Sequence, residues 1–130
     1  VFIHGGKTER VLFFPRYNES ELVGESRILP GKATVEDDIE LLVSEIVLGP
    51  MEIHHDRVLP KTTDVQSVIL REDTLYIDLS LDPVLKKGTS VLSFQEQIEA
   101  VQRSVRFNFP SIEEIIVSFR GETPELSDLR

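Results

Sequence analysis

The chain has 130 residues, a formal net charge of −9, and neither cysteine nor tryptophan. A chain of this length fits one domain, which can bury roughly two-thirds of its unfolded surface, and 40% hydrophobic residues are too many for intrinsic disorder. The negative charge argues against nucleic acid and anionic membranes as partners, since both attract clustered lysine and arginine. The absence of cysteine excludes disulfides, thiolate catalysis and cysteine-ligated metals. No run approaches the ~20 apolar residues of a membrane span, so direct membrane insertion by this domain is not expected.

Two strands are predicted in the first thirty residues. Residues 1–8 are expected to be a flexible lead-in. Residues 9–15 (ERVLFFP) combine β-branched and aromatic side chains and end at a proline, which is typical of a strand. Residues 24–30 (GESRILP) predict a second, short strand before Pro30 and Gly31 break it.

A helix is predicted next, with Thr34 as its N-cap, Asp37 in a capping-box position, and Gly49-Pro50 as its stop. Apolar residues at helical spacing should form one buried stripe: Val35, Ile39, Leu42, Val43, Ile46 and Val47. Acidic side chains in the first turns suit the positive end of the helix dipole: Glu36, Asp37, Asp38 and Glu40. Neighbouring carboxylates on a helix point apart, so a solvated face is favoured over an acid/base or metal site.

The following connection contains the closest approach to a metal-binding pattern, formed by Glu52, His54, His55 and Asp56. Side chains of adjacent residues diverge, however, and helical zinc sites use a pair of histidines four residues apart. His4 is the only other histidine. Surface-loop histidines are therefore the favoured interpretation, and no metal or cofactor is expected.

Residues 65–80 (VQSVILREDTLYIDLS) predict a β-hairpin whose two-residue turn is Glu72-Asp73. In that register the apolar face pairs Leu70 with Leu75, Val68 with Ile77 and Gln66 with Leu79. The opposite face pairs Ile69 with Tyr76 and Ser67 with Asp78. One face is almost wholly apolar and the other is mixed, as expected for a sheet that is covered on one side only.

A second helix is predicted from Ser93, which forms a capping box with Glu96, to Pro110. Its stripe contains Phe94, Ile98, Val101 and Val105, with Phe109 following. Glu99 and Arg103 are spaced for an ion pair on the wet side. The last strand covers residues 112–119 (IEEIIVSF), with Ile116 and Ser118 on one face and Ile115, Val117 and Phe119 on the other. Residues 121–130 are expected to be a flexible end.

This order predicts one α+β domain over residues 1–130. The expected architecture is a two-layer sandwich: a mixed sheet of three to five strands with two helices on one face. Its core order is helix, hairpin, helix, strand, preceded by an N-terminal strand. The last strand is expected to lie beside the first hairpin strand, antiparallel to it, in a split β-α-β arrangement.

Four segments of the chain resemble the GerMN domain, a family named after a bacterial spore-germination and sporulation protein. They are FFPRYNESELVGESRIL (residues 13–29), the helix end LGP (48–50), LPKTTDVQSVILREDTLYIDLS (59–80) and FNFPSIEEIIVSFRG (107–121). Each motif is unspecific by itself, but their order along nearly the whole chain matches the family. The chain departs from the family at three points. It holds one copy instead of two, Thr74 replaces the usual glycine, and Val105-Arg106-Phe107-Asn108 replaces a Thr-Leu-Thr step. These departures argue against a direct sporulation role more than they argue against the fold.

The resemblance implies a core like the ring-building motifs of secretion and sporulation channels. Members of the family are extracytoplasmic, and many are lipoproteins, so an anchor upstream of residue 1 is implied. Neither an enzymatic activity nor a cofactor is associated with the family. The function expected from the resemblance is a non-catalytic interaction module of the cell envelope, which binds a protein partner or itself.

The uncovered sheet face offers the candidate interaction surface: Ile69, Tyr76 and Ile116. Two alternatives stay open, because single exposed apolar residues are normal and because the N-terminal segment is able to cover this face. A different class of function is a domain that binds or hydrolyses cell-wall glycan, which would need converging carboxylates in a cleft. Its candidates, Asp73, Asp78 and Asp82, are better explained as turn and strand residues, so no catalytic residue is assigned.

Overall fold

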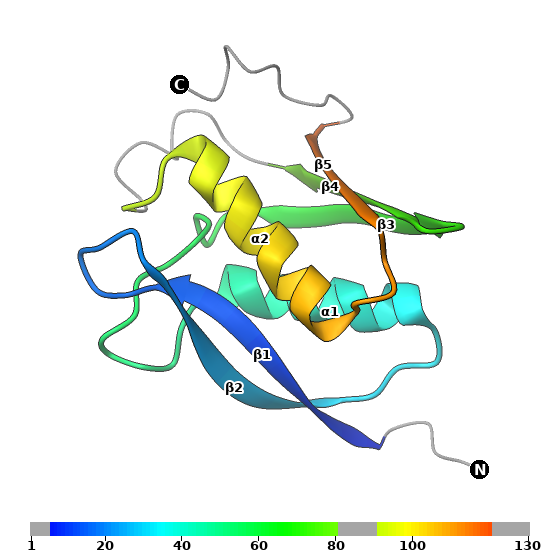
Figure 1. Cartoon of the computed structure of the whole chain (residues 1–130), viewed down its shortest axis with the longest axis horizontal. Coiled ribbons are helices and arrows are strands. Elements are labelled where there is room, and N and C mark those ends of the chain that lie inside the picture. The colour runs from blue at the N-terminus through cyan, green and yellow to red at the C-terminus, as the bar shows by residue number, and fades with distance from the viewer. Residues whose placement is uncertain (1–5, 81–90, 121–130) are drawn as a thin grey trace.

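The computed structural model describes residues 6–80 and 91–120. Within them the chain forms five strands and two helices in the order shown in Figure 1: β1 (Lys7–Pro15), β2 (Leu22–Pro30), α1 (Val35–Leu48), β3 (Asp64–Arg71), β4 (Thr74–Ser80), α2 (Phe94–Asn108) and β5 (Glu114–Phe119). The α+β class and the core order of helix, hairpin, helix and strand are confirmed. β1 already begins at Lys7, and β2 is a full nine residues long. The flexible lead-in expected over residues 1–8 is wrong for Lys7 and Thr8, which belong to β1. Residues 1–5 and the expected flexible end at 121–130 lie outside the described residues.

The two helices lie between two sheets (Figure 1). β3, β4 and β5 form a mixed three-stranded sheet, and β1 and β2 form a separate antiparallel pair. α1 packs on β3 and α2 packs on β5, so both helices cover one face of the mixed sheet, as predicted. β1 packs on α2 from the other side. In the described part of the chain, no helix is long and apolar enough to cross a membrane.

Side-chain caps define where both helices begin. In α1 the Thr34 hydroxyl accepts a hydrogen bond from the Asp37 N–H at 3.0 Å. In α2 both bonds of the predicted capping box are present, from Glu96 N–H to Ser93 Oγ and from Ser93 N–H to Glu96 Oε1. Gly49 ends α1 with φ +100°, a backbone conformation that L side chains rarely adopt. The boundaries of both helices therefore follow from local chemistry.

Most of the apolar residues predicted for the buried faces of the two helices are buried, but the two faces differ from the prediction at a few positions. Val35 was expected in the α1 stripe but is 47% exposed; it is the first helical residue, and the buried face of α1 begins at Ile39. The buried face of α2 includes two polar residues, Gln97 and Ser104. Ser104 Oγ accepts the N–H of Phe13 in β1, and Gln97 Nε2 donates to the carbonyl of Val58. Both bonds tie α2 to distant segments, which a helical pattern of apolar residues cannot reveal.

The β3–β4 hairpin has the predicted turn at Glu72-Asp73 and the predicted register near it. Leu70 lies opposite Leu75, Val68 opposite Ile77, Ile69 opposite Tyr76 and Ser67 opposite Asp78. The pairing of Gln66 with Leu79 is wrong, because the register shifts between Val65 and Ser67 and Val65 takes that place. The bulge leaves Gln66 in solvent and directs the apolar Val65 toward the core.

The position of β5 corrects the predicted topology. β5 pairs with β4 and runs parallel to it, whereas the expectation was an antiparallel pairing with β3. α1 packs on β3, and its Glu36 carboxylate accepts the N–H of Leu70 at 2.6 Å. A strand that pairs with the free edge of β3 would need the N–H of Leu70 for its own hydrogen bonds. Because Glu36 already binds this group, the free edge of β4 is the one available to β5.

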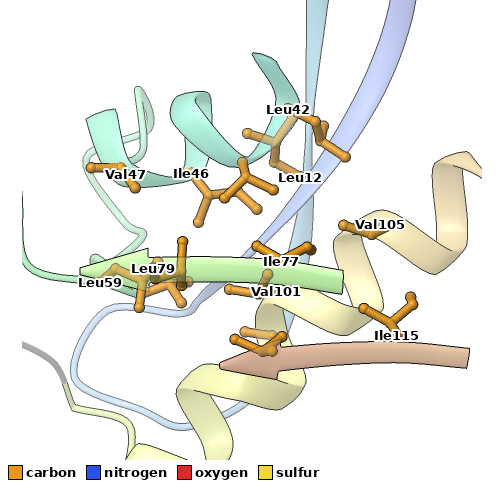
Figure 2. Packing of buried hydrophobic residues seen from close by; sticks show 14 of the residues in the cluster. Leu12, Leu42, Ile46, Val47, Leu59, Ile77, Leu79, Val101, Val105 and Ile115 are labelled. Carbon is orange, nitrogen blue, oxygen red and sulfur yellow. The ribbon is translucent and has the colours of Figure 1, made fainter. Parts of the chain in front are cut away.

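Apolar side chains from both sheets and both helices meet in one core (Figure 2). Leu12 of β1, Ile46 of α1, Ile77 of β4, Val101 of α2 and Ile115 of β5 all contribute to it. Each side chain of this size stabilises the fold by about 1.5–3 kcal/mol when it is fully buried. The core thus holds the mixed sheet rigid, and none of the described helices or strands packs on its opposite face.

Candidate interaction surface

The three residues predicted for an interaction surface stand in one row across the outer face of the mixed sheet. Ile69 of β3 lies opposite Tyr76 of β4, and Tyr76 lies opposite Ile116 of β5. Ile69 and Tyr76 are 39% and 43% exposed, and Ile116 is half-buried. Side chains that are direct cross-strand neighbours are in contact range, so the three form one continuous apolar strip.

Polar rows border this strip on both sides. One neighbouring row contains Ser67, Asp78 and Ser118, and the other contains Arg71, Thr74 and Glu114. Ser118 Oγ donates to Asp78 Oδ1 at 2.7 Å, which holds the first row together. An apolar centre inside a polar rim is the arrangement found in small protein interfaces.

The N-terminal strands do not cover the strip. β1 packs on α2, on the other side of the helix layer from the outer sheet face (Figure 1). The alternative that this segment shields Ile69 and Tyr76 is therefore wrong for the described residues.

Two of the carboxylates considered for glycan chemistry, Asp73 and Asp78, lie in the described residues and do not converge in a cleft. Asp73 lies exposed in the hairpin turn, where its carbonyl accepts the N–H groups of Glu113 and Glu114. Asp78 is hydrogen-bonded to Ser118 as described, and Asp82 lies outside the described residues. Two open hollows of about 300 and 470 Å³ occur on the wet sides of α1 and α2, and neither is lined by Asp73 or Asp78.

Two of the four side chains in the metal-like pattern bind different partners, and the other two are exposed. His55 Nδ1 lies 3.0 Å from Glu25 Oε1, and Asp56 Oδ2 accepts the N–H of Asn18. The side chains of His54 and Glu52 are exposed. Among residues 6–80 and 91–120, no three histidine, aspartate or glutamate side chains are grouped so that they could hold a metal ion.

A buried ion cluster, not anticipated from the sequence, lies beneath this connection. Glu25 and Arg27 of β2 are 5% and 6% exposed, and Arg27 Nη2 lies 2.6 Å from Glu25 Oε2. Arg27 Nη1 also contacts Glu45 Oε1 of α1 at 3.0 Å. The Glu25 carboxylate accepts the N–H groups of Met51 and Glu52 in addition to its contact with His55. The carboxylate is thus surrounded by donors from two segments of the chain, β2 and the connection after α1.

These donors determine the protonation of Glu25. Burial by itself raises the pKa of this carboxyl. The hydrogen bonds from Met51 N–H, Arg27, His55 and Glu52 N–H outweigh burial and hold the pKa below the usual glutamate value. Glu25 is therefore a carboxylate at neutral pH, and it anchors the connection between α1 and β3.

Two arginines from other segments complete the C-terminus of α1, whose last turn contains no basic residue of its own. Arg27 donates to the carbonyls of Glu45 and Gly49, and Arg57 donates to those of Val47 and Leu48. The negative end of a helix dipole favours cations at this position. The cluster therefore has a structural role as a clamp between β2, α1 and the connection that follows α1.

One signal in the sequence was available for this cluster. In β2, exposed and buried residues alternate, so Glu25, Arg27 and Leu29 share the inner face. Glu25 and Arg27 lie on the same strand face as the buried Leu29, which indicates that the two charged side chains are buried as a pair. The pattern does not reveal their partners on α1.

The predicted ion pair between Glu99 and Arg103 is not formed. The Arg103 guanidinium instead lies 4.3 Å from the centre of the Phe13 ring, and Gln95 Nε2 lies 3.4 Å from Glu99 Oε2. An exposed ion pair contributes little, and the contact with the Phe13 ring adds a cation–π attraction of comparable size.

The structure is a small α+β domain, and comparisons with known proteins find the same fold in solved GerMN domains. The first of the two GerMN domains of the Bacillus subtilis sporulation protein GerM superposes with a TM-score of 0.57 at 23% sequence identity, over 90% of this chain and 86% of that domain. The tandem GerMN domains of GerM match with a TM-score of 0.62 at 22% identity, over 92% of this chain. The present chain spans only 41% of the tandem protein.

A third solved structure, a protein of Clostridium perfringens described as a lipoprotein, matches 99% of this chain and 85% of its own with a TM-score of 0.54 and 20% identity. No protein-family model and no curated protein matches the sequence. At these identities the comparisons establish the fold. The chain therefore has the GerMN fold, and the resemblance drawn from its four sequence segments is confirmed at that level.

Proposed function

We propose that this domain is a non-catalytic protein-interaction module of the bacterial cell envelope, which assembles with a protein partner or with itself. The observation that carries the proposal is the apolar strip of Ile69, Tyr76 and Ile116 inside its polar rim. Because the sheet is rigid, a partner can bury this apolar area with little loss of conformational entropy in the domain.

The location in the envelope is supported by two of the similar structures. GerM is a sporulation protein, and the Clostridium perfringens protein is described as a lipoprotein. We extend these properties to this chain as part of the proposal: an extracytoplasmic domain whose full-length protein is anchored in the membrane. The net charge of −9 favours a protein partner over an anionic lipid surface.

Substitutions on the strip test the proposal. Tyr76→Asp and Ile69→Asp place a charge in the centre of the face, where both side chains already contact water, so the fold should persist. Sedimentation of the purified domain and partner capture after cross-linking in native cells should both show weaker association. Ile28→Asp is the matched control, because Ile28 is a 61% exposed strand residue on β2.

The proposal fails if both strip variants associate as the wild type does in sedimentation and in cross-linking. The non-catalytic assignment is tested separately with cell-wall fragments: turnover of any fragment would overturn it. Fractionation of the native cell tests location, since recovery of the full-length protein in the cytosol contradicts an envelope role.

A further inference from the structure

A second exposed apolar surface lies at the end of the molecule where the β1–β2 turn meets the connection after α1. Its four residues are Tyr17, Leu48, Met51 and Ile53, which we call the apolar tip. They are 63%, 68%, 78% and 84% exposed, the highest values among the large hydrophobic residues described. Isolated exposed apolar residues are common, but here the four most exposed ones are concentrated on two segments that pair with each other, which is unfavourable for solubility.

Backbone bonds hold the two segments of the tip together. The N–H of Tyr17 donates to the carbonyl of His54 at 2.6 Å, and the N–H of Asp56 donates to the carbonyl of Pro15 at 2.7 Å. Arg16 and His55 form an isolated antiparallel bridge at the same place. The β1–β2 turn and the connection therefore present their side chains as one unit.

The buried Glu25 carboxylate fixes the conformation of the connection. It accepts the N–H groups of both Met51 and Glu52, and its Oε1 also lies 3.0 Å from Nδ1 of His55, further along the same connection. Met51 and Ile53 are consequently displayed from a loop whose backbone is bound to a buried charge. A preorganised apolar loop loses little entropy when it binds a partner.

The charges around the tip indicate which partner fits. The exposed carboxylates of Glu19 and Glu52 have no ion pair within the described residues. Arg16 lies 3.3 Å from Glu21, and Arg57 is engaged by the carbonyls at the end of α1. The two carboxylates outnumber the one cation of Arg57, so the rim of the tip carries an excess of negative charge. This excess disfavours both an anionic lipid surface and the same tip on a second copy.

We propose that the apolar tip is a docking site for a partner protein whose contacting segment combines aliphatic or aromatic side chains with lysine or arginine. The apolar side chains of the partner cover Met51 and Ile53, and its cations face Glu19 and Glu52. This surface is built from other elements than the strip on the mixed sheet, so the two sites are tested independently.

A phage-displayed library of random linear peptides, selected on the immobilised wild-type domain, is the probe. The double variant Met51→Ser/Ile53→Ser serves for counter-selection, and it should fold normally because both side chains are largely in water. Enriched sequences should combine large apolar residues with lysine or arginine. Binding of the synthesised peptides, measured by fluorescence anisotropy, should weaken at least about tenfold in the double variant.

The contribution of the acidic side chains to peptide binding is measured separately. Glu52→Lys should weaken binding at least about threefold, and raising the salt concentration should reduce wild-type affinity in the same direction. Ile28→Ser is the matched control, since it removes an exposed isoleucine away from the tip. Tyr76→Asp is a second control: it tests the strip, and it should leave peptide binding unchanged.

Three results would overturn the docking site. The first is that no sequence is enriched over the counter-selection, or that the enriched sequences lack basic residues. The second is that Met51→Ser/Ile53→Ser binds the peptides as the wild type does. The third is that the wild type binds phosphatidylcholine vesicles, with or without phosphatidylglycerol, and loses this binding in the double variant, which would assign the tip to lipid.

Discussion

Replacing Arg27 by methionine removes the cation from the buried cluster while it keeps a side chain of similar length and an apolar stem. The Arg27 side chain is 5% exposed. It makes five hydrogen bonds: two to Glu25 Oε2, two to the carbonyl and the carboxylate of Glu45, and one to the carbonyl of Gly49. All five are lost in Arg27→Met.

The expected cost is about 3–5 kcal/mol of unfolding free energy, because removal of one partner leaves the other charge of a buried pair uncompensated. The charge left behind is Glu25, whose side chain is 5% exposed, while Glu45 at 17% has some access to water. Small domains are stable by about 5–15 kcal/mol in total. A single substitution of this charged residue, whose guanidinium lies 5.4 Å from the centre of the buried Phe14 ring, should therefore remove a large fraction of the stability.

Urea unfolding followed by far-UV circular dichroism measures this cost, since the chain contains no tryptophan for fluorescence. The double variant Glu25→Leu/Arg27→Met completes the test. With both charges gone no buried ion stays unpaired, so its loss should be clearly smaller than the sum of the two single losses. A loss below about 1 kcal/mol for Arg27→Met, or strict additivity in the double variant, would refute the structural role of the cluster.

Further substitutions test single contacts. The pKa of Glu25 is lowered in the fold, so its stabilisation is present above the usual glutamate pKa and disappears as the pH falls through the lowered value. In urea titrations from about pH 6 to about pH 2, the wild type should lose more stability than Glu25→Gln, and equal losses would contradict this linkage. Ser104→Ala leaves the N–H of Phe13 without its buried acceptor and should cost about 1–3 kcal/mol in urea unfolding, whereas a loss below about 0.5 would mean that another acceptor replaces Ser104. Gly49→Ala should cost about 1–3 kcal/mol, because φ is +100° and the new Cβ would lie 2.8 Å from Arg57 Nη2; an unchanged thermal midpoint would exclude strain at this residue.

Much of the local structure was predictable from neighbouring residues. Thr34 and Ser93 begin the two helices by bonds to residues three positions away, and a hydroxyl followed at that spacing is visible in any sequence. The register of Ile69 opposite Tyr76 follows from a two-residue turn and alternation along the strands. The same alternation predicted that these two residues share the uncovered face with Ile116.

Interactions between distant segments were predicted less well. The bulge at Gln66 and the pairing of β5 with β4 depend on what else packs against β3, and α1 occupies that side. The buried pair of Glu25 and Arg27 was missed because charged residues in a strand are normally assigned to solvent. Their burial is possible only where the end of α1 and the next connection supply carbonyls and N–H groups.

The sequence by itself determined the class of the fold, the helix starts, the hairpin and the residues of the apolar strip, since each depends on spacing within one segment or across one turn. Only the tertiary structure decided which edge β5 joins, how two charges are buried beneath a loop, and that the β1–β2 turn pairs with the connection after α1. The physical reason is distance along the chain. Hydrogen bonds and burial that join residues dozens of positions apart leave no periodic trace in either segment, and they exist only once the core has brought the segments together.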